Sequence, residues 1–236
     1  MEKTNTVWMN GVVRPDSFTV VRRTAESVVA DFRFGTAVPK KDAPRERRKL
    51  DVDYDWMYHS VRVSATGDDV RKILDLERGC RERPVDPKVF ELRGVLYEDD
   101  RMYRIECLAG DLVPTRRFRP VGNNRAELVG SVLATSYTDL YAKVTLDTGR
   151  FRDASGNVKD IVNTVYINRS EFPEAWEDVS KGKYRAGSAM SMSGPVHSGE
   201  FNDGDKRLVC MMVQPRVVEK VKLSQSRKMG QGPSVG

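Results

Sequence analysis

The sequence predicts an all-β protein built of two five-stranded barrels in tandem, each with a short helix. The first observation is that short apolar segments with alternating polar residues, typical of strands, recur along most of the 236 residues. The second is that one order of elements (three strands, a helix and two strands) occurs twice. A third observation concerns the partner: 40 Lys and Arg against 34 Asp and Glu give a net charge of +6, which fits an acidic polymer.

The first half of the chain supplies the first set of elements. Residues 68–78 (DDVRKILDLER) have the apolar spacing of a helix, and we expect Gly79 to end it. The charged segment 39–49, bracketed by prolines, is typical of a hairpin loop. We expect strands over five segments: 7–13, 28–34, 54–64, 90–97 and 102–108.

The second half repeats this order after a loop at 114–124. We expect residues 170–179 to form a short helical or irregular element, in which Pro173 is tolerated only in a first turn. The predicted strands are 127–134, 140–147, 161–168, 184–195 and 208–213. The predicted divisions are a first barrel over 1–115, a basic linker over 116–124, a second barrel over 125–223 and a flexible basic tail over 224–236.

Three pairs of glycines mark corresponding points of the two halves: Gly11 with Gly130, Gly79 with Gly182, and Gly94 with Gly194. A small barrel must bend its strands sharply, and glycine permits the bend. Five-stranded barrels of this order are typical of the OB-fold. That fold binds oligonucleotides and oligosaccharides on the face of its second and third strands.

Composition and motifs argue against several classes of protein. No apolar run is long enough to cross a membrane, and the start, MEKTNTVW, lacks the core of a signal peptide, so we expect a cytoplasmic protein. Cys80, Cys107 and Cys210 form no C-x-x-C pair, which argues against a zinc site or a disulfide framework. We expect no cofactor and no metal.

Enzyme motifs are also weak. The phosphate-binding pattern G-x-x-x-x-G-K-[ST] is missing, and we expect a protein without catalytic residues. One enzymatic alternative stays open, a nuclease that binds a metal ion through Asp51, Asp53 and Asp55. Solvated carboxylates at the entry of a strand explain the same three residues more simply.

Several segments together resemble the bacterial single-stranded DNA-binding protein family. Residues 5–113 carry NTVWMNGVV, VVADFRFGTAV, YHSVRVSATGDDVRKILDLERG and VFELRGVLYEDDRMYRIECLAGDLV in the family's order. Residues 124–222 repeat the likeness more weakly through AELVGSVL, KGKYRAGSAMSMSGPV and RLVCMMVQPRVVEKV. The tandem form resembles members with two OB-folds per chain, which dimerise, and a mobile-element, plasmid or phage version fits this likeness.

The resemblance implies a protein that coats and protects single-stranded DNA (RNA is an open alternative) during replication, recombination, repair or transfer. It also implies a homodimer. The final residues, LSQSRKMGQGPSVG, are basic and lack the family's acidic tip with a terminal phenylalanine, so we expect no recruitment of partners through such a tip. A second reading remains, an OB-fold scaffold whose main role is to bind proteins in a replication or recombination complex.

Binding of single strands without regard to sequence needs exposed aromatic faces and cations along the phosphates. Strand parity places Tyr54, Trp56 and Tyr58 on one face, and the resemblance puts Trp56 and Tyr97 near the family's stacking tryptophans. The alternative for each ring is a place in the barrel core; we expect that place for Trp8 and an exposed one for Trp56. The stacking candidates are Phe34, Tyr54, Trp56, Tyr58, Tyr97, Tyr141 and Tyr166.

Cations that could follow the phosphates lie in both halves and in the linker, where they would form a basic bridge between the barrels. A run such as 45–49 is also compatible with a solvated loop, although loops of OB-folds line the binding groove. The phosphate candidates are Arg33, Lys40, Lys41, Arg45, Arg47, Arg48, Lys49, Arg62, Arg93, Arg116, Arg117, Arg119, Lys143, Arg150 and Arg152. Arg22 and Lys159 belong to the same wider set.

Overall fold

The computed structural model describes residues 2–40, 54–83, 88–98, 103–203, 206–213 and 217–221. Within these ranges, the side chains of 198–217 and 221 are not described. Several predicted residues lie outside these ranges, among them the tail over 224–236 and the nuclease candidates Asp51 and Asp53. The predicted phosphate contacts outside the described residues are Lys41, Arg45, Arg47, Arg48 and Lys49.

The first barrel is a closed circuit of five strands. β1 pairs with β3 and β5, β3 with β4, β4 with β6 in parallel, and β6 with β5, which closes the ring. Helix α2 (Asp69–Glu82) follows the third strand of the circuit. The strands are β1 (Thr4–Val13), β3 (Ser27–Pro39), β4 (Tyr54–Thr66), β5 (Val89–Glu98) and β6 (Tyr103–Leu108).

Smaller elements extend the first barrel. They are the 3-10 turn η1 (Pro15–Ser17), β2 (Thr19–Arg23) beside β3, the turn η2 (Ala109–Asp111) and β7 (Leu112–Pro114) beside β5. Alternation sets the two faces of each long strand: on β3, Val28, Ala30, Phe32 and Phe34 point into the core.

The second barrel repeats the arrangement with one insertion. Its ladders run in the order β10, β9, β8, β11 and β14, and helix α3 (Pro173–Ser180) again follows the third strand. The strands are β8 (Asn124–Tyr137), β9 (Tyr141–Arg152), β10 (Val158–Asn168), β11 (Ala189–Gly194) and β14 (Val217–Val221). The inserted hairpin consists of β12 (Val196–Asp203) and β13 (Lys206–Val213), and it lies between strands β11 and β14 in the chain.

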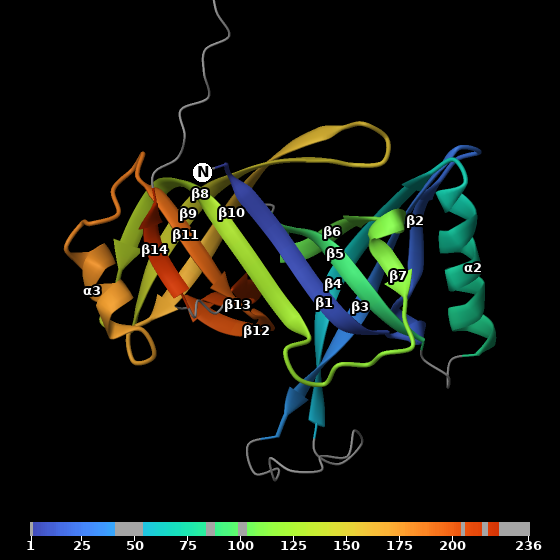
Figure 1. Cartoon of the computed structure of the whole chain (residues 1–236), viewed down its shortest axis with the longest axis horizontal. Helices are drawn as coiled ribbons and strands as arrows, with labels where there is room; N and C mark the ends of the chain where they lie inside the picture. Colours follow the sequence, from blue (N-terminus) through green and yellow to red (C-terminus); the bar gives the residue numbers. More distant parts are fainter. Residues whose placement is uncertain are drawn as a thin grey trace, which may run out of the picture.

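The first strands of the two barrels pair with each other. β1 and β8 run antiparallel, with Thr4 opposite Val129 and Met9 opposite Asn124, and they lie side by side at the centre of Figure 1. Side-chain amides reinforce this junction: the Asn5 side chain donates to the Leu96 carbonyl and to Asn163 Oδ1, each at 2.8 Å. The two barrels therefore form one continuous sheet with helices α2 and α3 at opposite ends of the molecule.

The register of the ladders confirms two of the three glycine correspondences. Val7 of β1 lies opposite Gly94, and Ala126 of β8 lies opposite Gly194, so Gly94 and Gly194 hold the same place in the two barrels. Gly11 and Gly130 also match. A Cβ atom on Gly11 would lie 2.0 Å from the Gly35 carbonyl oxygen, and one on Gly130 would lie 2.4 Å from the Asp147 carbonyl oxygen.

The third correspondence is wrong, and so is the predicted end of the first helix. α2 continues through Gly79 to Glu82, because nothing at this position requires a left-handed backbone or a break. Gly182 instead follows the end of α3 and has a φ of 73°, a conformation in which glycine is favoured. A glycine in a helical pattern was therefore mistaken for a cap.

We expect Gly11→Ala to lower the free energy of unfolding by about 2 kcal/mol or more, because the new methyl group meets a backbone carbonyl that cannot move aside. Gly79→Ala is the matched control. Its Cβ would meet nothing within 4 Å, so it should stabilise the helix by about 0.5–1 kcal/mol. Urea denaturation followed by circular dichroism measures both, and equal midpoints for the two variants would contradict the steric role of Gly11.

Candidate nucleic-acid interface

Two aromatic rings lie close to a glycine on the outer face of the first barrel. Trp56 and Tyr58 of β4 are in register with Ala37 and Gly35 of β3. A Cβ atom on Gly35 would come within 2.9 Å of the Tyr58 ring and 3.1 Å of the Trp56 ring. The missing side chain thus lets both rings lie against the strand. Trp56 is 36% exposed, which confirms its predicted exposure.

Cations and a third ring surround these two aromatics. The Arg14 guanidinium lies 5.3 Å from the centre of the Tyr58 ring, and Phe118 lies 5.6 Å from Trp56. Arg33, on the same face, donates a hydrogen bond to Ser60 Oγ. Lys40 lies at the end of β3, where its ammonium is 3.9 Å from Asp55. We call the outer surface of β3 and β4 around Trp56 and Tyr58 the aromatic face.

Sequence reasoning missed Arg14 and Phe118. Arg14 directly follows β1, and its N–H donates to the Arg33 carbonyl of β3 at 2.8 Å, which places its guanidinium over Tyr58 of β4. Phe118 carried a readable signal, since an aromatic residue among arginines (Arg116-Arg117-Phe118-Arg119) is the composition of a nucleic-acid contact.

The linker between the barrels is fastened to β1 through one buried asparagine. Asn10 is fully buried; its amide nitrogen donates to the Arg117 carbonyl (2.9 Å), and its oxygen accepts from the Arg119 N–H (2.7 Å). The predicted contacts Arg116, Arg117 and Arg119 are all exposed. The linker therefore presents its arginines from a fixed backbone beside the aromatic face, with Phe118 as the contact.

Trp8 is not a core residue, contrary to the prediction. It points to the outer side of β1, half-buried, with exposed Arg93 and Arg125 opposite it on the two neighbouring strands. The Arg119 guanidinium lies 5.7 Å from its ring. The apolar neighbours Val7 and Met9 point to the opposite side, so parity, not local composition, decides which side of the strand faces the core.

Three predicted stacking residues are buried, which contradicts a stacking role for them in this structure. Phe34 is 0% exposed because it alternates with Arg33 and so points into the core. Tyr54 and Tyr166 keep only 6% and 7% of their surface exposed. A base needs an open ring face, and among the predicted rings of the first barrel Trp56 is exposed while Tyr58 and Tyr97 are half-buried.

The corresponding face of the second barrel is occupied by the chain itself. Tyr141 packs edge-on against Tyr166 at 5.5 Å, and Lys143 lies 5.7 Å from the Tyr166 ring. Close by, the Glu98 carboxylate of the first barrel accepts hydrogen bonds from Tyr103 Oη (2.7 Å) and the Thr164 N–H (2.6 Å). Burial and the charge of Glu98 raise the pKa of Tyr103 well above its ordinary value.

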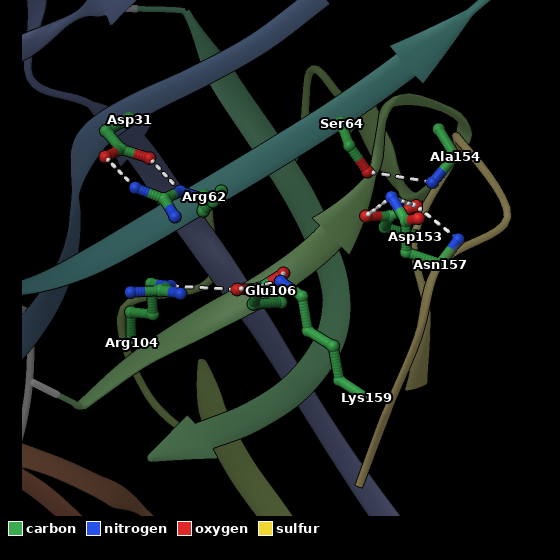
Figure 2. A network of polar contacts seen from close by, with 9 residues as sticks. All are labelled: Asp31, Arg62, Ser64, Arg104, Glu106, Asp153, Ala154, Asn157 and Lys159. Atoms are coloured by element: carbon green, nitrogen blue, oxygen red, sulfur yellow. Dashed lines mark hydrogen bonds and ion pairs between the residues drawn. The ribbon is translucent and has the colours of Figure 1, made fainter. Parts of the chain in front are cut away.

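The β9–β10 hairpin of the second barrel crosses onto the first barrel, as Figure 1 shows at its upper edge. Lys159 reaches Glu106 at 3.0 Å, and Arg104 reaches the same carboxylate at 2.9 Å (Figure 2). The Glu106 side chain is only 3% exposed. Both cations also lie near the Tyr97 ring, at 5.0 Å and 4.9 Å, so this predicted stacking residue is already flanked by cations.

The remaining predicted cations are dispersed. Arg62 binds both oxygens of Asp31 at 2.7 Å on the outer face of β4. Arg150 pairs with Asp160 at 2.8 Å on the β9–β10 hairpin, and Arg152 is exposed near its tip. Of these three arginines, only Arg62 lies on the same strand as Trp56.

A neutral histidine lies under the aromatic face. His59 is fully buried and shares a hydrogen bond of 2.9 Å with the Thr36 hydroxyl. Burial, with a smaller effect of the charge of His197, lowers the pKa of His59 from 6.5 to about 3. The ring is therefore uncharged in the folded protein near neutral pH.

Within the described ranges, no group of three or more His, Cys, Asp or Glu side chains could hold a metal ion. Neither of the two described α-helices has the length and apolarity that crossing a membrane would require.

No protein-family model and no curated protein matches the sequence. Among solved structures, the wild-type single-stranded DNA-binding protein from Thermus aquaticus is similar, with a TM-score of 0.57 at 14% identity over 99% of this chain and 100% of that chain. The chain has the fold of that protein. A deletion mutant of the same Thermus protein gives a TM-score of 0.55 at 14% identity, over 95% of this chain and 98% of that chain. The predicted fold, two tandem OB-fold barrels each with a short helix, is confirmed.

We expect the stability of the protein to fall as the pH drops below about 6.5, where the unfolded chain protonates His59 and the folded chain does not. The loss approaches about 1.4 kcal/mol for each pH unit down to the folded pKa. Urea denaturation at neutral and at mildly acidic pH measures it. His59→Gln should remove most of this dependence and His197→Gln should keep it. If His59→Gln loses as much stability at acidic pH as the natural protein does, His59 is not the source of the pH dependence.

Proposed function

We propose that the protein binds single-stranded DNA largely without regard to sequence, and that it coats and protects the strand during replication, recombination, repair or transfer. The observation that carries the proposal is the aromatic face, where Trp56 and Tyr58 offer ring surface beside the cations Arg14 and Arg33. Every base has a ring face, so stacking on these residues tolerates any sequence.

The charge and the fold support the same reading. The aromatic face lies on the second and third strands of an OB-fold barrel, where proteins of this fold bind oligonucleotides. The linker adds three exposed arginines, and the whole chain carries a net charge of +6. The homodimer and the cytoplasmic location expected from the sequence stay predictions.

We expect oligo-dT to quench the tryptophan fluorescence of the protein and to bind less tightly as salt rises, because cations displace counterions from the phosphates. Trp56→Ala should weaken binding by about 1–3 kcal/mol, the usual contribution of one stacked base. Tyr137→Ala is the matched control, since Tyr137 is 57% exposed on β8 in the second barrel and should leave the affinity unchanged.

Gel shift and fluorescence titration at low salt make both measurements. A natural protein that does not bind oligo-dT at low salt would overturn the proposed function. Equal affinities for Trp56→Ala and the natural protein would remove the aromatic face from it.

A further inference from the structure

The tip of the β9–β10 hairpin is fixed to the outer surface of the first barrel. The Ala154 N–H donates to Ser64 Oγ at 3.2 Å, and Thr66 Oγ1 donates to the Ala154 carbonyl at 3.4 Å. Arg22 Nη2 lies 3.5 Å from Ser155 Oγ. Nearer the base of the hairpin, Lys159 holds the buried carboxylate of Glu106. The hairpin is thus attached at two places along its length, as Figure 2 shows.

A cavity of about 370 Å³ remains between these attachments. Cations from three distant parts of the chain line it: Arg22 from β2, Arg62 from β4 and Lys159 from β10. Arg62 and Lys159 already have carboxylate partners, Asp31 and Glu106. Arg22 has no ion pair with a described carboxylate, and its guanidinium contacts the Ser155 hydroxyl. Two carboxylates, Asp153 and Glu106, also line the cavity, and the guanidinium of Arg22 can donate hydrogen bonds to a phosphate there.

The cavity continues the aromatic face along the same strand. Tyr58, Ser60, Arg62 and Ser64 all lie on the outer side of β4, because alternate residues of a strand share a face. From Tyr58 to Arg62 the β-strand rises by about 13 Å. Single-stranded DNA that stacks a base on Tyr58 and follows β4 therefore reaches the cavity directly.

We propose that the single strand passes beneath the β9–β10 hairpin and that the cavity there holds a nucleotide with its phosphate. This inference rests on the proposed function. Arg22 and Arg62 contact the phosphate, Ser64 lines the path, and the Lys159–Glu106 pair keeps the hairpin closed above it. A strand enclosed in this way is retained by the fold as well as by its contacts.

The test links the hairpin covalently to the first barrel after DNA has bound. Thr66→Cys and Ala154→Cys place one thiol on each side of the contact, and neither residue lines the cavity. The background replaces Cys80, Cys107 and Cys210 by alanine, and its binding to oligo-dT is measured first. A short thiol crosslinker then closes a covalent loop of chain from residue 66 to residue 154 around any strand beneath the hairpin.

A closed circle of single-stranded DNA should stay attached to the crosslinked protein in denaturing detergent, whereas a linear strand of the same sequence should leave. Cutting the trapped circle should release it. Ala154→Cys alone, treated with the same crosslinker, should retain no circle. Release of the circle from the double variant as complete as from this control would overturn the proposal, while binding before crosslinking would show that the proposed function still holds.

A second measurement uses Arg22→Gln in the otherwise natural chain. We expect it to weaken binding to oligo-dT about threefold or more and to reduce the dependence of binding on salt by about one phosphate contact. Arg81→Gln is the matched control, because Arg81 is an exposed cation on α2, paired with Glu77, away from the hairpin. Equal affinities for the two variants would remove Arg22 from the cavity site.

Discussion

The antiparallel ladder between β1 and β8 is the constraint on which the rest of the molecule depends. β1 pairs along one edge with β8 over Thr4–Met9 and along the other with β5 over Val7–Val12. The same strand thus belongs to the closed circuit of the first barrel and to the junction with the second. Every contact between the barrels takes its position from this pairing, because a slip of one residue would turn each side chain to the other face.

The ladder relates the barrels by an approximate symmetry, which the hairpins then break. Both first strands carry a glycine where a neighbouring carbonyl comes close, Gly11 and Gly130. The hairpin of the second barrel, however, lies across the first barrel and buries Glu106 between two cations. A buried carboxylate is costly without partners, so Arg104 and Lys159 compensate its charge, and Lys159 also fastens the hairpin to the first barrel. The corresponding strands of the first barrel keep Trp56 and Tyr58 open.

The sequence predicted the repeat, the two helical elements and the exposure of Trp56. These follow from periodicity and from spacing, which depend on neighbours in the chain. The predictions were wrong where they had to decide which side chains of a strand face the barrel core. Phe34 and Trp8 are both aromatic residues in strands, yet Phe34 points into the barrel and Trp8 points out of it. Composition alone could not separate them, because the direction is set by which neighbours the strand pairs with. The predicted end of the first helix at Gly79 was wrong for a related reason, because a glycine in a helical pattern is compatible with either the end of the helix or its continuation.

The sequence by itself determined most elements, the duplicated order of strands and helices, and the net basic charge, because these follow from local pattern and charge. It did not predict β14 (Val217–Val221) as the last strand of the second barrel, because the predicted segment 208–213 belongs to the inserted β12–β13 hairpin. Only the tertiary structure decided which residues meet. Arg22, Arg62 and Lys159 are separated by 40 and 97 positions in the chain, and they line one cavity only because the β9–β10 hairpin folds back across the first barrel. The physical reason is that strand pairing and buried ion pairs act between segments whose separation along the chain carries no signal in either segment alone.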